Sequence, residues 1–307
     1  MVVVGESCFV LKGIEPNQKS QTRSLARVRA GRALGLLIGV SSSLSLREKL
    51  LGKYQRMISV IPASEIPSVT TKEMIEVDRA MMEDYRIDLP RMMENAGRSL
   101  AELSRSEFLR GSGSDRHVLV LAGSGGNGGG ALVAARHLSN WGAKVTVFLA
   151  QSRGAMTSVP AHQLSILGEL GLDIIGPANV EARQEEFDSA DVILDGLIGY
   201  SLKGAPYGPA AQLIAQANKS LAVTIALDAP SGVDANSGTV FDPAIEAAAT
   251  MTLALPKTGL LNADLRRNIG ELYCADISVP PALYSRFLSK TVPPIYADSG
   301  ILRVDFS

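Results

Sequence analysis

The sequence predicts an α/β protein with a three-layer α/β/α Rossmann-like fold and a mostly parallel sheet, preceded by an N-terminal helical pair. Short β-branched and leucine-rich runs alternate with helical periodicity, as expected of βαβ units whose sheet is covered on both faces. A glycine-rich loop joins the first clear strand to the next helix. The 307 residues, 46% hydrophobic and 20% charged, suffice for one such domain with additional segments.

Residues 1–57 differ in composition from the rest of the chain. They hold ten basic residues and three acidic ones, whereas the whole chain holds 30 and 31. Three interpretations are open: a mitochondrial or plastid transit peptide, a secretory signal, or a disordered or misannotated start, with a cytoplasmic protein that begins at Met57. The secretory signal is disfavoured because the apolar stretch at 33–40 begins late, and that stretch is too short to span a bilayer. We therefore place the domain at 58–290 and a C-terminal tail at 291–307.

Two helices are predicted between Thr70 and Arg110. Thr70 or Thr71 followed by Glu73 is a capping-box signature for the first helix, and the second begins near Leu89. Their methionines recur at helical spacing, which is more typical of a core or a subunit contact than of a cofactor site.

Strands and helices alternate through the rest of the domain. The predicted strands lie at 117–122, 144–149, 173–175, 192–195, 221–228, 250–255 and 271–277. The predicted helices follow the glycine loop and lie at 160–170, 180–187 and 209–217.

The glycine loop, from Ser124 to Gly130, is the expected place for a nucleotide or phosphate. It lets a ligand approach the backbone closely, and the following helix offers unpaired N–H groups and a positive dipole end. Residues 123–128 satisfy G-x-G-x-x-G, but Ala150-Gln151 at the end of the next strand offers no ribose-binding acid of a dinucleotide site. No Lys-Ser/Thr pair follows the glycines, which excludes a P-loop, and Ala122 excludes a nucleophile elbow.

Composition argues against several other functions. A net charge of −1 and an aromatic content of 5% do not favour nucleic-acid binding. Two distant cysteines and three histidines without metal spacing give no support for a disulfide framework, a zinc site or a Cys-His nucleophile. We predict no transmembrane segment.

Two more loops follow apolar strands, which stop at Asp195 and Asp228. For either loop alone, an aspartate that caps a helix or turn is the simpler interpretation. Three such loops at one edge of a parallel sheet instead favour a ligand site. The two carboxylates, with the Asn127 amide and the Ser231 hydroxyl, suit an alkali or alkaline-earth cation better than zinc.

At several of these stretches the sequence resembles the NAD(P)HX epimerase family, also called the YjeF N-terminal domain. The shared stretches, in the family's order, are 69–74 with Asp78, 93–98, the glycine loop with 132–138, 195–199, 228–232 and 254–259. The resemblance implies repair of NADHX and NADPHX, the hydrated forms of NADH and NADPH, by interconversion of their R and S epimers. It also implies a separate ATP- or ADP-dependent NAD(P)HX dehydratase as functional partner, and a homodimer formed through the helices at 70–110.

The same resemblance implies a role for individual residues. Potassium would be held by Asn127, Asp195 and Ser231. Asp195 is our choice for the general acid–base, since a buried carboxylate beside a cation and the substrate ring is placed for proton transfer. The residues expected to contact the substrate are Gly126, Asn127, Gly128, Gly129, Gly130, Gly199, Tyr200, Ser201, Leu202, Lys203, Gly204, Ala205 and Asp228.

The chain departs from the family pattern in the glycine loop. Gly126 and Gly130 stand where the family has Asn and Asp, Ala131 replaces the glycine that follows, and Ser201 replaces a glycine of the second loop. These losses define an alternative: a catalytically impaired family member that binds a nucleotide-like ligand or a protein partner. An ordinary NAD-dependent oxidoreductase ranks third, because the ribose acid is missing.

Overall fold

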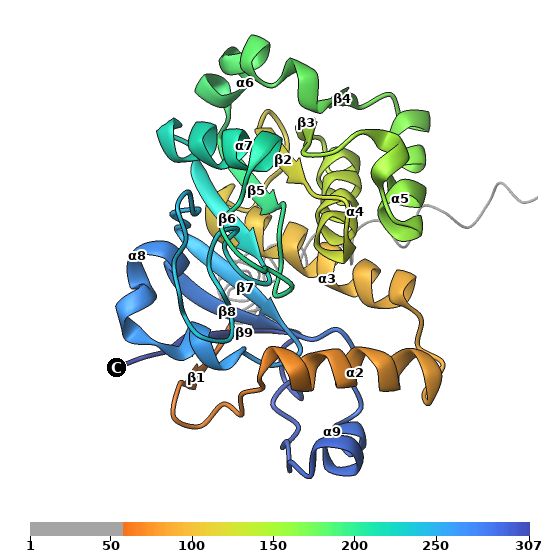
Figure 1. The fold of residues 1–307 in the computed structure, drawn as a ribbon, viewed down its shortest axis with the longest axis vertical. Helices are drawn as coiled ribbons and strands as arrows, with labels where there is room; N and C mark the ends of the chain where they lie inside the picture. The colour runs from red at the N-terminus through yellow and green to blue at the C-terminus, as the bar shows by residue number, and fades with distance from the viewer. Residues whose placement is uncertain (1–57) are drawn as a thin grey trace, which may run out of the picture. The chain divides into compact units, whose positions relative to one another are not determined.

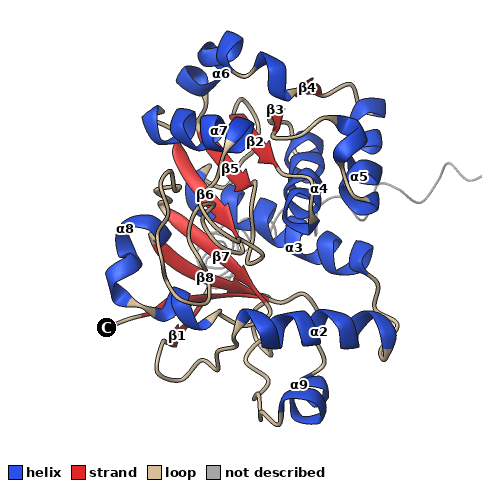
Figure 2. Cartoon of the chain, viewed as in Figure 1, coloured by secondary structure: helices blue, strands red, loops and turns tan. Residues whose placement is uncertain are grey.

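The structure is a computed structural model that describes residues 58–307, so the predictions for the N-terminal extension lie outside the described residues. A nine-stranded sheet runs through this part of the chain, with helices on both faces (Figure 1, Figure 2). The strands are β1 (Ser59–Pro62), β2 (His117–Ala122), β3 (Lys144–Leu149), β4 (Asp173–Ile175), β5 (Val192–Gly196), β6 (Val223–Leu227), β7 (Ala249–Leu253), β8 (Glu271–Ala275) and β9 (Ile301–Asp305). The helices are α2 (Thr71–Glu83), α3 (Leu89–Leu103), α4 (Gly126–Asn140), α5 (Ser158–Glu169), α6 (Gln184–Ser189), α7 (Gly208–Lys219), α8 (Arg266–Ile269) and α9 (Pro281–Leu288).

The strand order is β1-β9-β8-β7-β6-β5-β2-β3-β4. Neighbouring strands are parallel except for β8 and β9, which are antiparallel. The three-layer, mostly parallel architecture predicted from the sequence is therefore confirmed.

Alternate residues of β2 show how the two faces are covered. Val118 and Val120 belong to the core shared with α3, α4 and α5. Leu119 and Leu121 belong to the opposite core, which is shared with α6 and α7. Because every residue of β2 is buried, the strand reads as a continuous apolar run.

The N-terminal helical pair is confirmed, and its methionines are core residues except for Met82, which is exposed. Thr70 caps α2 in a capping box, since its hydroxyl accepts from the Glu73 N–H and its own N–H donates to the Glu73 carboxylate. Met74 and Met92 are buried in the core beneath α2 and α3. Helix α3 packs closely on α4, because a Cβ built on Gly97 would lie 2.3 Å from the Gly130 carbonyl oxygen.

Two parts of the sequence-based prediction were wrong. Helix α4 begins at Gly126 with Gly125 as its N-cap, so most of the expected glycine loop forms the first turns of the helix. The segment 291–307 is not a tail, because β9 pairs with β1 and β8 in the sheet. Ile301, Leu302 and Val304 are buried, which shows why this short strand joins the sheet. Strand β1 and helix α9 were also not predicted.

Within residues 58–307 we find no helix that combines the length and apolar character needed to cross a membrane.

Candidate active site

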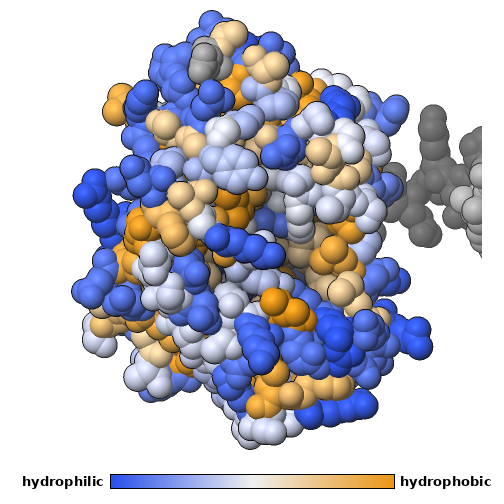
Figure 3. Space-filling model, viewed as in Figure 1, coloured by the Kyte–Doolittle hydropathy of each residue, from blue (hydrophilic) through white to orange (hydrophobic). Residues whose placement is uncertain are grey.

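Loops from the carboxyl ends of β2, β5 and β6 enclose a cavity of about 660 Å³ together with helix α2. The space-filling view shows this face hollowed near its middle (Figure 3). Parallel α/β sheets place ligands at this edge, as the sequence predicted. The residues of the cavity wall are Ile75, Asp78, Arg79, Met82, Leu89, Met93, Ser124, Gly125, Gly126, Asn127, Leu197, Ile198, Gly199, Tyr200, Ser201, Leu227, Asp228 and Leu253.

Helix α4 points its N-terminus at this cavity. Gly125, Gly126 and Asn127, at the start of the helix, belong to the cavity wall. A helix N-terminus offers unpaired N–H groups and a partial positive charge, which favour an anionic or strongly polar ligand. The tight turn depends on glycine, since a Cβ on Gly123 would lie 1.9 Å from the Leu197 carbonyl oxygen.

The predicted glycine contacts divide into two groups. Gly126 and Asn127 line the cavity, whereas Gly128, Gly129 and Gly130 do not. The latter three are buried where α4 packs against its neighbours. They permit close packing and are not in the cavity wall, so their contact with the substrate stays a prediction.

Asp195, at the end of β5, is fully buried and joins two of the loops. Its carboxylate accepts hydrogen bonds from the Ser231 N–H (2.7 Å), the Ser231 hydroxyl (2.7 Å) and the Leu197 N–H (3.1 Å). Burial raises the pKa of Asp195 to about 6, although the bonds from Ser231 and Leu197 act in the opposite direction. Asp195 is absent from the cavity wall and both its oxygens are engaged, so the geometry does not support its predicted role as general acid–base.

Asp228 has the placement that was expected of Asp195. It belongs to the cavity wall, forms a buried ion pair with Lys257, and accepts a hydrogen bond from the Tyr200 N–H at 3.2 Å. Its φ of +67° lies in the left-handed region, which a short polar side chain tolerates better than a bulky one. A carboxylate held by a cation at the wall of a cavity can exchange protons with a bound molecule.

Lys257 is a functional-site residue for which the sequence analysis predicted no role. Its side chain is 1% exposed, and its ammonium also donates to the Leu253 carbonyl oxygen (3.1 Å) and the Thr252 hydroxyl (3.4 Å). The sequence feature that could have indicated this role is a single lysine in the apolar segment Ala254-Leu-Pro-Lys, directly after a strand. A buried lysine requires a partner, and here that partner is Asp228.

Asn127 and Asp228 meet across Gly199. A Cβ on Gly199 would lie 3.2 Å from Asn127 Cγ and 3.2 Å from Asp228 Oδ2. The Asn127 amide nitrogen donates to the Leu227 carbonyl oxygen at 3.1 Å. Hence the glycine at 199 gives both polar side chains room beside the backbone.

The second predicted loop contributes to two adjoining cavities. Gly199, Tyr200 and Ser201 line the first cavity. A second cavity of about 390 Å³ is lined by the rest of the loop and by residues after β2 and β3. Its wall includes Ser201, Leu202, Lys203, Gly204, Ala205, Gln151 and Tyr207, and it shares Ser124, Leu197, Ile198 and Ser201 with the first cavity. An elongated ligand could therefore extend from one cavity into the other.

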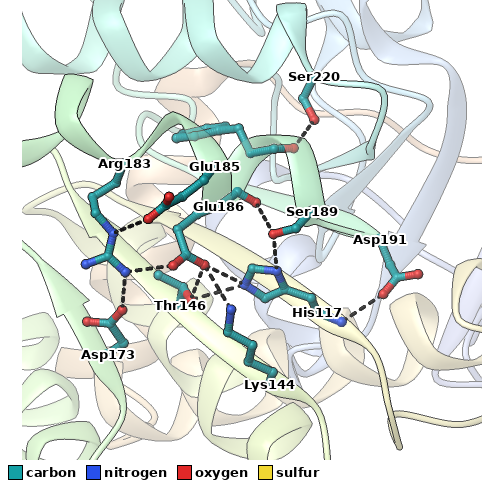
Figure 4. Close-up of polar contacts among 11 residues, drawn as sticks. His117, Lys144, Thr146, Asp173, Arg183, Glu185, Glu186, Ser189, Asp191 and Ser220 are labelled. Carbon is teal, nitrogen blue, oxygen red and sulfur yellow. Dashed lines mark hydrogen bonds and ion pairs between the residues drawn. The ribbon is translucent and has the colours of Figure 1, made fainter.

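A polar cluster at the opposite ends of β2 and β3 does not belong to the cavity. Glu186 of α6 accepts hydrogen bonds from Arg183, Lys144 and Thr146, and its carboxylate lies 3.1 Å from His117 Nε2 (Figure 4). These contacts tie α6 to the starts of the two strands. Among residues 58–307, no group of three or more His, Cys, Asp or Glu side chains is arranged to hold a metal ion.

Comparison with known proteins places these features in a family. Residues 90–259 match the family model described as "YjeF-related protein N-terminus". The NAD(P)H-hydrate epimerase of Dehalogenimonas lykanthroporepellens is 45% identical over 221 residues, covering 72% of this chain and 86% of that protein. The NAD(P)H-hydrate epimerase of Rhodopirellula baltica is 33% identical, with 74% and 90% covered.

Two further matches are to a longer enzyme and to a solved structure. The bifunctional NAD(P)H-hydrate repair enzyme Nnr of Moorella thermoacetica is 37% identical over 70% of this chain, which corresponds to 41% of the longer enzyme. The crystal structure of the yeast protein ynu0 superposes with a TM-score of 0.66 at 26% identity, covering 78% of this chain and all of that one. By the family model and by its relatives, this chain belongs to the YjeF-related N-terminal family.

Proposed function

We propose that this protein is an NAD(P)H-hydrate epimerase, an isomerase that interconverts the R and S epimers of NADHX and NADPHX. Two relatives with this name are 45% and 33% identical over most of the chain. The placement of Asp228 supports the function most directly, because this ion-paired carboxylate faces the cavity into which α4 points its N-terminus. We assign the general acid–base role to Asp228 in place of Asp195.

The two adjoining cavities suit a dinucleotide. A hydrated nicotinamide ring would lie in the cavity that contains Asp228, and the remaining part of the ligand would extend past Ser201 into the second cavity. Lys203 in the second cavity supplies a positive charge for phosphate groups. The adjoining cavities and the charge of Lys203 support a dinucleotide as substrate.

We also propose that potassium binds beside Asp195, held by Asn127, Asp195 and Ser231. The fit rests on the fully buried Asp195 carboxylate, whose hydrogen-bond donors are all neutral and which forms no ion pair with any residue of 58–307. A buried charge without compensation is strongly destabilising, so a monovalent cation would be favoured here. The available ligands are oxygen atoms, as a hard cation requires, and bound potassium would supply positive charge next to the substrate site.

A separate dehydratase would complete the repair. The Moorella relative is named as bifunctional, and this chain corresponds to less than half of it. We propose that an ATP- or ADP-dependent NAD(P)HX dehydratase on another chain consumes the epimer formed here. Homodimerisation through α2 and α3 stays a prediction.

The decisive experiment uses an NADHX epimer mixture and an excess of an S-specific dehydratase with its nucleotide cofactor. After the S epimer is consumed, this protein is added with potassium or with choline at equal ionic strength, and recovery of NADH absorbance is followed. A second phase faster than the spontaneous rate supports the epimerase, and its dependence on potassium supports the cation. A folded protein that adds no rate above the spontaneous one would favour the binding-module alternative.

A further inference from the structure

The cavity wall contains a second carboxylate, Asp78 of α2, in addition to Asp228 after β6. Tyr200 connects the two acids. Its N–H donates to Asp228 Oδ2 at 3.2 Å, and its phenol donates to Asp78 Oδ2 at 2.5 Å. Tyr200 therefore contacts both carboxylates through two different donors, its backbone N–H and its phenol.

The two acids have different surroundings. Asp228 is ion-paired with Lys257, whereas Asp78 forms no ion pair within the described part of the chain. Asp78 is half-buried, and its Oδ1 makes no hydrogen bond to any residue of 58–307. Asp78 thus belongs to the cavity wall and has one oxygen without a hydrogen-bond partner among these residues.

Burial raises the pKa of Asp78 and outweighs the opposing effects of the Tyr200 hydrogen bond and the Lys257 charge, while the nearby Asp228 charge raises it further. The groups that face Asp78 are Tyr200, Lys257 and Asp228, together with Tyr284 of α9, whose own pKa the Asp78 charge helps to raise. A carboxyl group whose pKa is raised by its surroundings at the wall of a cavity is a candidate for a general acid.

We propose that Asp78 is a second catalytic acid–base residue of the epimerisation and works from the opposite side of the substrate ring to Asp228. This inference rests on the proposed function. Inversion at a hydroxyl-bearing carbon requires one group that assists the departure of the hydroxyl as water from one face of the ring. It also requires a second group that assists the addition of water to the other face. Tyr200 holds Asp78 at its position, and we assign it as a positioning residue.

The chemistry follows from the structure of a hydrated dihydronicotinamide. Hydration of its enamine double bond leaves the hydroxyl on a carbon bonded to the ring nitrogen. Protonated Asp78 donates its proton to this hydroxyl as the C–O bond breaks, water departs, and the nitrogen lone pair forms a C=N bond. A second water adds to the other face of the carbon, the C=N electron pair returns to nitrogen, and ionised Asp228 takes the proton of the water. The opposite epimer uses the two acids in exchanged roles, so no further reactant is needed.

A purely structural role for Asp78, as an anchor for Tyr200, predicts a different outcome. Loss of the anchor would weaken substrate binding and raise KM without affecting the proton-transfer step. The catalytic role predicts a fall in kcat in both directions and the loss of one side of a bell-shaped pH profile. It also predicts that solvent oxygen enters the product once for every inversion.

The test compares wild type, Asp78→Asn, Tyr200→Phe and the control Glu102→Gln, a carboxylate on the outer side of α3 that is paired with Arg98. For each protein, kcat and KM for both epimers are measured across pH, and incorporation of ¹⁸O from labelled water is followed by mass spectrometry. We expect Asp78→Asn to lower kcat by about 10²- to 10³-fold with KM changed less than about threefold. Tyr200→Phe removes the hydrogen bond that lowers the pKa of Asp78, so the alkaline limb should move to higher pH.

Several results would overturn the proposal. One is an Asp78→Asn enzyme with kcat within about threefold of wild type, or with only KM altered. Another is wild-type epimerisation with less than one ¹⁸O per inversion, a measurement that stays decisive if Asp78→Asn does not fold. A folded wild-type protein without any epimerase activity would refute the proposed function itself, and is thereby distinguished from a failure of Asp78 alone.

Discussion

Gly130 packs directly beneath Leu227: a Cβ built on Gly130 would lie 2.9 Å from Leu227 Cδ2. Leu227 ends β6 and lines the cavity, so its side chain takes up the space that any larger residue at 130 would need. Gly126 is different, because a Cβ there would meet only Met93 Sδ at 3.8 Å. The two glycines that depart from the family pattern therefore have different structural consequences.

We expect Gly130→Asp to destabilise the protein by about 1–3 kcal/mol, since overpacking at a buried helix position forces Leu227 or the backbone to move. Leu227→Val in the same chain should recover part of this loss by making room. Urea unfolding of the single and double variants measures both effects. Gly126→Asn serves as the control and should leave the unfolding free energy within about 0.5 kcal/mol. Equal destabilisation by the two glycine substitutions would contradict this packing.

The acid–base assignment can be tested by a substitution of Asp228. Asp228→Asn removes the carboxylate at the cavity wall and should lower kcat by about 10²- to 10⁴-fold. The measurement is the epimerisation rate at saturating substrate, with circular dichroism to verify folding. A variant at Asp228 that retains full kcat would show that Asp228 is not a general acid–base of the reaction.

Removal of the Lys257 charge should be costly because it leaves Asp228 buried without a partner. Lys257→Met is expected to reduce the unfolding free energy by about 3–5 kcal/mol. The matched control is Arg267→Met, whose ion pair with Glu246 is exposed and should contribute less than about 1 kcal/mol. Similar losses in the two variants would mean that the Lys257–Asp228 pair is not effectively desolvated.

Much of the fold and of the site could be predicted from the sequence. Asn127, Asp195, Asp228 and Ser231 follow strands of one parallel sheet, so their proximity follows from topology alone. Contributions to the site from more distant segments could not be predicted in this way. Lys257, which follows β7, forms its ion pair with Asp228. Val69, which lies just before α2, forms a β-bridge with Lys257, and this bridge brings Asp78 of α2 to the cavity. Strand β9 was missed because a strand of five residues carries little periodic signal.

Potassium should stabilise the folded protein if it binds beside Asp195. A ligand that binds only the folded state raises stability with its concentration, by about 2.7 kcal/mol at 100 times its Kd. We expect Tm to rise with the logarithm of potassium concentration, relative to choline at equal ionic strength. Asp195→Asn should abolish the difference between the two salts. A Tm that responds equally to both salts would contradict the proposed cation site.

The Glu186 cluster predicts how stability depends on acid pH. Burial alone would raise the pKa of Glu186, but hydrogen bonds from Arg183 and Lys144 and the Lys144 charge outweigh it and lower the pKa from 4.5 to about 2. A carboxyl whose folded pKa is depressed contributes stability above its unfolded pKa and loses it as pH falls through the folded value. The contribution of Glu186 should thus be complete above about pH 4.5 and decline toward pH 2.

Glu186→Gln isolates this contribution. At pH 7 the variant should be less stable by about 1–3 kcal/mol, because the donors of a buried carboxylate lose a charged acceptor. Urea unfolding between pH 7 and pH 2 should show this difference shrinking only below about pH 4.5, where wild type loses the same interaction. Glu185→Gln is the matched control, since its side chain is 79% exposed and lies 3.9 Å from Arg183. A difference between wild type and Glu186→Gln that stays constant down to pH 2 would show that the pKa of Glu186 is the same in the folded and unfolded protein.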